Sequence, residues 1–255
     1  MENVYLDTYI ADKLSDKKRS ALLVIPGGGY SCVCADREGY PIAEAFIPYG
    51  FNAFILNYYT GKQIPFPIQL TEAALAIKHI KDNAEEYGID PERVFVIGFS
   101  AGGHLAACTA TMWHLPEIYE SVGATPESIR PTGAMLMYPV ISPKYHDYSF
   151  KNLVHYDFPG EQTLEKLSVD KRVTEKSSPV FILHTSDDSV VDVRNSLVYA
   201  EACKEAGIQF EMHIYPSAPH GVALANEITS MGRPEWDNKR IAEWVRLASE
   251  WSLTI

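Results

Sequence analysis

The 255-residue chain has no long hydrophobic run. Its longest apolar stretches, such as residues 21–25 and 51–56, have the length of strands and are far too short to span a bilayer. The N-terminal segment is polar and mixed in charge, without a basic flank before an apolar run, so no targeting segment is indicated. We therefore expect a cytoplasmic protein without a membrane partner.

Cysteine is scarce as well, with four residues in the whole chain. Cys32 and Cys34 form a C-x-C pair, but no second pair completes a zinc-binding set. Cys108 and Cys203 lie in apolar helical patterns. We expect reduced thiols that serve mainly for packing, and neither a metal nor an organic cofactor.

Basic residues are outnumbered by acidic ones, 22 against 33, which gives a net charge of −11. Such a surface repels phosphate backbones and anionic membranes, so nucleic acid is not expected as a partner. With 46% hydrophobic residues, the chain can bury one substantial core but is short for two full domains. We predict a single domain over residues 1–255 and leave self-association open.

Short apolar or β-branched runs alternate with helical periodicity along the chain. This alternation predicts βαβ units and an α/β fold, with a mostly parallel sheet flanked by helices on both faces. Ligands of such sheets bind beyond the carboxyl ends of the strands. The expected strands are residues 20–25, 51–58, 94–97, 133–138, 180–185 and 209–215, and the expected helices are residues 41–49, 67–87, 102–112, 193–206 and 237–251.

The sharpest local pattern is Gly-Phe-Ser-Ala-Gly at residues 98–102, a G-x-S-x-G centred on Ser100. It follows an expected strand and precedes an expected helix, which is the context that this pattern requires. Glycines on both sides allow a turn so tight that side chains would clash there. The pattern predicts that Ser100 is a nucleophile, held out at the sheet edge and at a helix N-terminus.

A second glycine-rich loop, Pro-Gly-Gly-Gly-Tyr at residues 26–30, follows the first expected strand. Consecutive glycines let backbone N–H groups face a cleft, where they can stabilise the negative charge of an oxyanion. We expect donors from Gly28, Gly29 or Tyr30, with the Ala101 N–H as the other half. The loop lacks both glycine patterns that bind phosphate. A mobile turn without function is an equal alternative for this loop taken alone.

Two further polar groups follow the last two expected strands. Asp187 and Asp188 come after the strand at 180–185, and a carboxylate there can orient an imidazole. We favour Asp188 and expect Asp187 to cap or brace the loop. His220 lies in a Pro-His-Gly sequence after the last strand and is the candidate general base. The resulting chain order, Ser100, Asp188, His220, is that of α/β-hydrolases.

Residues 139–178 break the alternation and are rich in aromatic side chains. We interpret this segment as a small cap over the site, with Tyr145, Tyr148, Tyr156 and Phe158 among its aromatics. Tyr30 and Tyr145 are the candidate substrate-binding residues of an aromatic cleft suited to sugar faces. Ordinary half-buried packing of these tyrosines is an equal alternative. A short cap favours small acyl groups.

The chain resembles the lipolytic α/β-hydrolases, in particular the bacterial branch similar to acetyl-xylan and feruloyl esterases. The resemblance rests on P-G-G-G-Y at 26–30, E-G at 38–39, D-P-E-R-V-F-V-I-G-F-S-A-G-G-H-L-A at 90–106, Y-P-V-I-S at 138–142, H-T-S-D-D-S-V-V at 184–191, N-S-L at 195–197 and P-H-G at 219–221. It implies the triad Ser100, Asp188, His220 and an oxyanion hole at Gly28, Gly29 and Ala101. Many relatives carry His where this chain has Pro26.

These patterns together predict a serine carboxylesterase that acts through an acyl-enzyme. Its expected substrate is a small acyl ester, above all an acetyl ester, of a small molecule or a carbohydrate. One alternative is a peptidase, a formamidase-like amidase or a lipase on the same fold. Another is an α/β-hydrolase that binds a ligand without catalysis, although this chain has a candidate for every part of the triad.

Overall fold

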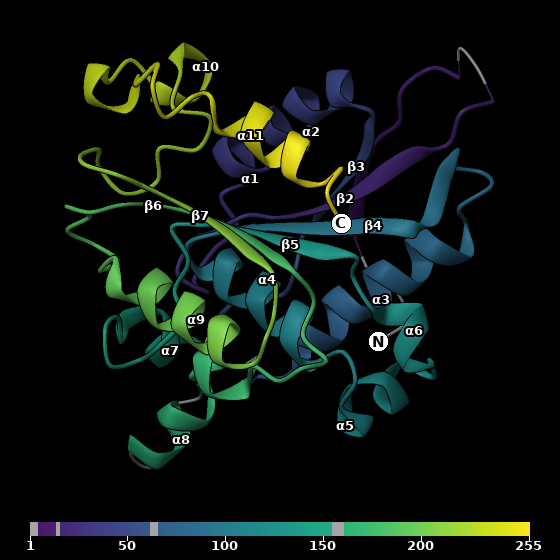
Figure 1. Ribbon diagram of the computed structural model, residues 1–255, viewed down its shortest axis with the longest axis horizontal. Helices are drawn as coiled ribbons and strands as arrows, with labels where there is room; N and C mark the ends of the chain where they lie inside the picture. The colour runs from purple at the N-terminus through teal and green to yellow at the C-terminus, as the bar shows by residue number, and fades with distance from the viewer. Residues whose placement is uncertain (1–4, 14–15, 62–65, 155–160) are drawn as a thin grey trace.

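The computed structural model describes residues 5–13, 16–61, 66–154 and 161–255, and a seven-stranded sheet lies at its centre (Figure 1). The strand order is β1-β3-β2-β4-β5-β6-β7. Strand β1 runs antiparallel to β3, and the other five described pairs are parallel. The α/β class predicted from the sequence is thus confirmed. The strands are β1 (Leu6–Tyr9), β2 (Arg19–Ile25), β3 (Phe51–Leu56), β4 (Ile89–Phe99), β5 (Gly133–Met137), β6 (Val180–Thr185) and β7 (Phe210–Tyr215).

Helices cover both faces of the sheet. Figure 1 shows α3, α4 and α9 on one face and α1, α2 and α11 on the other. The α-helices are α1 (Ala35–Glu38), α2 (Tyr40–Phe46), α3 (Ile68–Asp82), α4 (Ala101–Met112), α5 (Pro116–Tyr119), α6 (Pro126–Ile129), α7 (Tyr148–Leu153), α8 (Glu161–Lys166), α9 (Arg194–Glu205), α10 (Glu227–Ser230) and α11 (Trp244–Trp251). The 3₁₀ turns are η1 (Ile47–Tyr49), η2 (Glu120–Val122), η3 (Val169–Arg172) and η4 (Pro234–Trp236).

The central strands are buried on both faces, which explains their almost unbroken apolar sequences. Every residue of β3, β5 and β6 is buried. Successive side chains of a strand point to opposite faces, so Leu23 packs in the core beneath α3 and α4, while Leu22 packs beneath α2 and α11. This double burial fixes the sheet and therefore the positions of the loops at its carboxyl edge.

Several elements differ from the sequence prediction. The edge strand β1 was not expected, because three of its four residues are half-buried, one is exposed, and they form no apolar run. Helix α11 begins at Trp244 rather than at 237, because the Asn238 side chain accepts the N–H groups of Arg240 and Ile241 and forms a separate turn. The irregular segment contains α7, α8 and η3. Tyr156 and Phe158 lie outside the described residues.

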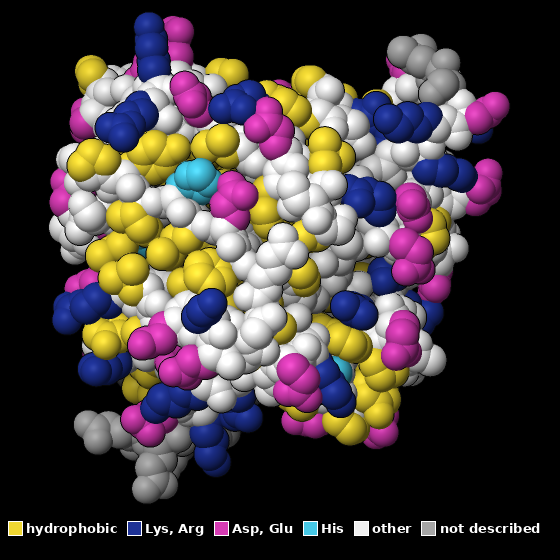
Figure 2. Space-filling model, viewed as in Figure 1, with side chains coloured by type: hydrophobic (Ala, Val, Ile, Leu, Met, Phe, Trp, Pro, Cys, Tyr) yellow, Lys and Arg dark blue, Asp and Glu magenta, His cyan; other side chains and the backbone are white. Residues whose placement is uncertain are grey.

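None of the helices in the described part of the chain combines the length and the hydrophobicity of a bilayer span. On the face shown in Figure 2, acidic and basic side chains are interspersed rather than sorted into separate regions. Charges of both signs thus share the same surface of the molecule on this side.

Candidate active site

The carboxyl edge of the sheet brings together the three residues predicted for the triad. Ser100 directly follows β4, Asp188 lies in the loop after β6, and His220 lies in the loop after β7. These loops are on the left in Figure 1, between the helices of the two faces. Parallel strands end at the same edge of a sheet, so residues far apart in the sequence meet there.

Ser100 occupies a sharp turn between β4 and α4. Its backbone has φ 52° and ψ −116°, a region that residues with a side chain rarely adopt and that costs about 1–3 kcal/mol. The flanking glycines permit the turn: a Cβ on Gly98 would lie 2.1 Å from the Gly102 carbonyl oxygen, and a Cβ on Gly102 would lie 2.2 Å from that of Ile25. The turn therefore requires glycine at both positions.

Replacing Gly102 by alanine is expected to destabilise the protein by about 3 kcal/mol, because the new methyl group meets backbone carbonyl oxygens that cannot move aside. Urea unfolding of the purified variant measures this loss. The matched control is Gly123→Ala, where φ is +60° but the added methyl group meets open space, so that about 1 kcal/mol is expected. Equal losses in the two variants would contradict the tight packing of this turn.

A row of hydrogen bonds joins the three side chains. His220 Nε2 lies 2.9 Å from Ser100 Oγ, and His220 Nδ1 lies 2.7 Å from Asp188 Oδ2. Burial raises the pKa of Asp188, but hydrogen bonds from His184, His220 and the Val191 N–H lower it by more, so that its pKa falls well below the usual range. An ionised carboxylate only accepts, so Nδ1 carries the proton and Nε2 is free to accept the Ser100 hydroxyl proton.

The two adjacent aspartates have different environments. Asp188 Oδ1 accepts the N–H groups of Val190 and Val191, which fixes the carboxylate beneath His220. The Asp187 carboxylate instead accepts the Ser217 hydroxyl at 2.5 Å and the Ala218 N–H at 3.2 Å. Asp187 therefore holds the loop after β6 to the loop that carries His220, as the sequence predicted for a bracing residue.

A buried histidine lies behind Asp188. His184 Nε2 is 3.4 Å from Asp188 Oδ2 and donates to the Val191 carbonyl at 2.9 Å. His184 Nδ1 accepts the Ser196 hydroxyl at 2.7 Å. His184 therefore holds the loop that carries Asp188 to the first turn of α9. This role of His184 could not be predicted from the sequence, because a histidine at the end of a buried strand carries no local signal of such contacts.

Side chains from neighbouring elements fix the glycine-rich loop after β2 by hydrogen bonds. Gly28 has φ +127° and Gly29 has φ +62°, conformations that glycine adopts without strain. The Tyr58 hydroxyl donates to the Pro26 carbonyl at 2.7 Å, and Asn152 of α7 donates to the Gly29 carbonyl at 2.9 Å. The carbonyls of this loop are therefore engaged in fixed contacts with other elements.

Three backbone N–H groups are predicted to form an oxyanion hole. For those of Gly28, Gly29 and Ala101 the described residues provide no hydrogen-bond acceptor. Gly28 and Gly29 line the same cleft as Ser100. Ala101 is the first residue of α4, where the helix dipole favours negative charge. Free donors of this kind can bind an anionic oxygen next to the serine.

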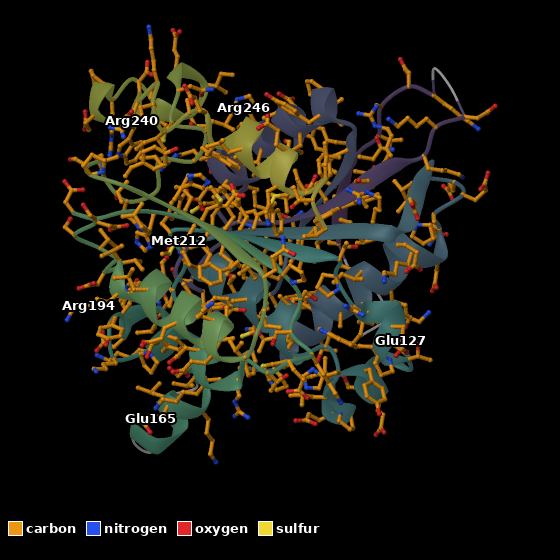
Figure 3. All side chains as sticks on the ribbon, viewed as in Figure 1. Glu127, Glu165, Arg194, Met212, Arg240 and Arg246 are labelled. Atoms are coloured by element: carbon orange, nitrogen blue, oxygen red, sulfur yellow. The ribbon has the colours of Figure 1, made fainter. Side chains whose placement is uncertain are left out.

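The two tyrosines predicted to bind substrate lie elsewhere. Tyr30 is 1% exposed, and its hydroxyl donates to His104 Nδ1 at 2.8 Å, so the expected contact with a substrate does not fit its position. Tyr145 is half-buried and packs against the guanidinium of Arg194, 4.9 Å from its ring centre, at the start of α9. Figure 3 labels Arg194 below the sheet. Tyr145 is not among the residues that line the cleft of Ser100.

Other side chains form the walls of the cleft. Arg37 stacks on Trp236 at 4.0 Å on one side, and the segment that precedes and starts α7 lies on the other. There His146 Nε2 accepts the Ser149 hydroxyl at 2.9 Å, and His146 Nδ1 donates to the Val190 carbonyl at 3.0 Å. The sequence indicated only that this irregular segment was rich in aromatic side chains. The lining residues are Gly28, Gly29, Ser31, Cys34, Arg37, Glu38, Ser100, His146, Tyr148, Ser149, Val190, His220, Gly221 and Trp236.

His104 and Cys34, both near the site, are uncharged at pH 7. Burial lowers the pKa of His104 to about 4, so its imidazole is neutral at pH 7, and it is hydrogen-bonded in the core to the Tyr30 hydroxyl and the Leu167 carbonyl. Burial and the nearby Glu38 raise the pKa of Cys34 to about 12, so this thiol stays protonated. Within the described ranges, no three His, Cys, Asp or Glu residues are grouped to hold a metal ion.

The fold and the site together define an α/β-hydrolase. The sheet is mostly parallel and has helices on both faces, a strained serine lies between β4 and α4, and an aspartate and a histidine follow the last two strands. The chain belongs to the BD-FAE family, whose model matches residues 6–202.

Named relatives share much of this chain. The endo-1,4-beta-xylanase B of Butyrivibrio fibrisolvens is 37% identical over 83% of this chain and 34% of its own length. The acetylxylan esterase of Xylanibacter ruminicola is 28% identical over 87% of this chain and 48% of its own. The chain thus spans between a third and about half of these two proteins.

A solved structure agrees over nearly the whole chain. The acetyl ester-xyloside bifunctional hydrolase from Caldicellulosiruptor lactoaceticus has a TM-score of 0.83 and 35% identity. The match covers 98% of this chain and 88% of that one.

Proposed function

We propose that this chain is a serine carboxylesterase that hydrolyses small acyl esters, above all acetyl esters, of small alcohols or carbohydrates. The observation that carries the proposal is the row of hydrogen bonds from Ser100 through His220 to Asp188. Free backbone donors beside the serine supply the second requirement of acyl transfer. The position of these groups at one edge of the sheet supports the proposal.

The reaction proceeds in two steps of acyl transfer. Ser100 Oγ attacks the ester carbonyl while His220 Nε2 takes its proton, and Asp188 stabilises the imidazolium that forms. The carbonyl oxygen becomes an anion facing the N–H groups of Gly28, Gly29 and Ala101. The imidazolium then protonates the leaving alcohol. Water, activated by His220, attacks the acyl-enzyme in the same way and releases the acid.

The names of the relatives support a carbohydrate ester as the substrate. An acetylxylan esterase and an acetyl ester-xyloside hydrolase are both similar to this chain over more than four fifths of its length. Arg37, which lines the cleft, offers guanidinium N–H donors to the hydroxyl groups of an alcohol, and Trp236 beside it offers apolar ring surface to the carbon atoms of a sugar. We therefore propose an acetylated sugar as the natural class of substrate.

Acetyl esters are expected to react faster than long-chain esters, by at least about tenfold in kcat/KM between p-nitrophenyl acetate and decanoate. The reason is the segment at α7: the Tyr148 ring lies 3.0 Å from where a Cβ on Gly29 would be, and Asn152 fixes α7 to the same glycine. This closure next to the oxyanion donors leaves little room for a long acyl chain. A preference for decanoate would contradict it.

A panel of substrates with one shared control tests the function itself. Acetylated xylo-oligosaccharides and aryl acetates are compared with an aryl anilide and an aryl xyloside, each with wild type and Ser100→Ala. Acetate release that depends on Ser100 supports the proposal. Faster cleavage of the anilide would favour an amidase, and no Ser100-dependent release from any ester would refute esterase activity.

A further inference from the structure

We propose that Glu38 is a positioning residue, whose buried carboxylate ties the oxyanion loop at residues 26–30 to the loop that carries His220. The inference rests on the proposed function, since it concerns the two groups that the esterase reaction must hold in register. Glu38 is the last residue of α1 and is 5% exposed. A carboxylate so deeply buried requires hydrogen-bond donors for its oxygens.

Each oxygen of Glu38 contacts a different part of the site. Oε2 accepts the backbone N–H of Gly27 at 2.8 Å, and Oε1 accepts the Tyr138 hydroxyl at 2.8 Å. Gly27 is also next to the nucleophile, because a Cβ on it would lie 3.1 Å from Ser100 Cβ. One carboxylate oxygen thus fixes the peptide that leads into the oxyanion donors of Gly28 and Gly29.

Tyr138 carries the second contact to the histidine. Its hydroxyl accepts the Ala223 N–H at 3.1 Å, and its ring packs edge-on against the His220 imidazole, with centroids 5.0 Å apart. Burial, chiefly, and the nearby Glu38 raise the pKa of Tyr138 well above its usual value, so the hydroxyl keeps its proton and donates it to Glu38. The backbone of Tyr138 has φ +38°, a left-handed conformation that a side chain adopts only when its surroundings hold it.

The neighbour of Glu38 on α1 contacts the same histidine loop. Arg37 donates to the carbonyl oxygen of Gly221, the residue that follows His220. A Cβ on Gly221 would lie 3.9 Å from Glu38 Oε1, so the carboxylate and this loop are in direct proximity. The end of α1 therefore sets the distance between the oxyanion donors and the imidazole.

Glutamine at position 38 would keep the shape of the Glu38 side chain but lose one of its two accepted hydrogen bonds. Its single carbonyl oxygen can accept one of the two donors, while its NH₂ group faces the other donor. Phenylalanine at position 138 removes the link from the opposite end, because Glu38 Oε1 and the Ala223 N–H both lose the Tyr138 hydroxyl as their partner. Because both changes break one connected network, their effects should be less than additive in the double variant.

The experiment compares Glu38→Gln, Tyr138→Phe and the double variant with two matched controls. Glu72→Gln alters another buried carboxylate, which accepts the Tyr59 N–H at 3.0 Å. Tyr199→Phe removes another buried hydroxyl, which is bonded to Thr111 at 2.8 Å. The readouts are kcat and KM for p-nitrophenyl acetate, the Kd of phenylboronic acid, which forms a tetrahedral adduct with an active serine, and Tm.

A positioning role predicts a loss of about 10²-fold in kcat for Glu38→Gln and Tyr138→Phe, comparable to the loss of one oxyanion donor, with KM changed less than about threefold. Binding of phenylboronic acid should weaken by at least about tenfold, because the adduct needs the donors and the imidazole in register. The two control variants should retain wild-type kcat and Kd at a similar Tm.

Other outcomes separate the two claims. Wild-type kcat and Kd in Glu38→Gln and Tyr138→Phe, with an active parent, would overturn the inference and leave the proposed function intact. Equal losses in all four single variants, in proportion to Tm, would also overturn it, since Glu38 would then contribute only to stability. A wild type that neither hydrolyses esters nor binds the boronate would refute the proposed function itself.

Discussion

Replacing Ser100 by alanine is expected to lower kcat for ester hydrolysis by about 10⁵-fold or more. The variant lacks the oxygen that we propose is acylated, so the remaining site could only bind and polarise the ester. Alanine fits the left-handed turn no better than serine, so the free energy of unfolding should change little. Initial rates with p-nitrophenyl acetate, with urea unfolding in parallel, measure both quantities.

The control for this variant is Ser121→Ala in η2, whose hydroxyl donates to the Ile118 carbonyl away from the cleft. It should keep wild-type kcat. The specific rival is Ser149, which lines the same cleft and is paired with His146 at 2.9 Å. If Ser100→Ala kept most of its activity and Ser149→Ala lost it, the assignment of the nucleophile to Ser100 would be wrong.

Replacing Asp188 by asparagine is expected to lower kcat by about 10⁴-fold. The ionised carboxylate makes His220 carry its proton on Nδ1 and leaves Nε2 to accept from Ser100. An amide can present its NH₂ group instead, which favours the tautomer with the proton on Nε2, and it does not stabilise the imidazolium. Steady-state kinetics of the purified variant measure the loss.

The comparison variant is Asp187→Asn, the adjacent carboxylate that braces the loop of His220 through Ser217 and Ala218. A loss of less than about tenfold is expected there, because an amide oxygen can still accept one of these bonds. A larger loss of kcat in Asp187→Asn than in Asp188→Asn would show that the assignment of the triad acid to Asp188 is wrong.

The same carboxylate gives the stability of the protein a dependence on pH. Asp188 has a depressed pKa in the folded state, so its ionisation stabilises the fold above its unfolded pKa of about 3.9, and this contribution is lost as the pH falls through the folded value. Asp188→Asn lacks this contribution. The difference in unfolding free energy between wild type and variant should therefore shrink below pH 4, as urea titrations at several pH values would show.

The central strands and the helices packed on them were predictable, because double burial gives strands an apolar run and one buried face gives a helix its period. The 51–56 run and the apolar positions of α3 follow this rule closely. Strand β1 and the short helices α5 and α6 were missed, since none of them has enough buried residues to show a period. The assignment of residues 1–255 to one domain stays a prediction.

The three residues of the proposed triad were predictable for a different reason. Ser100 and the glycines around it are dictated by one turn, and His220 and Asp188 each follow a recognisable strand. The roles proposed for Glu38 and Tyr138 could not be predicted in this way, because they depend on a contact between residues that are 100 positions apart in the sequence. Tyr30 and Tyr145 were predicted from their aromatic rings alone, and neither lines the cleft, because Tyr30 is buried and Tyr145 packs against Arg194.

The most direct test of the catalytic role of Ser100 is covalent labelling of the intact protein with a fluorophosphonate, followed by peptide mass spectrometry. This reagent reacts with a serine whose proton is taken by a neighbouring base and whose oxyanion is stabilised. The expected result is a single adduct on Ser100, absent from Ser100→Ala and strongly slowed in Asp188→Asn. An adduct on a different serine, or an active esterase that takes no label, would contradict the assignment.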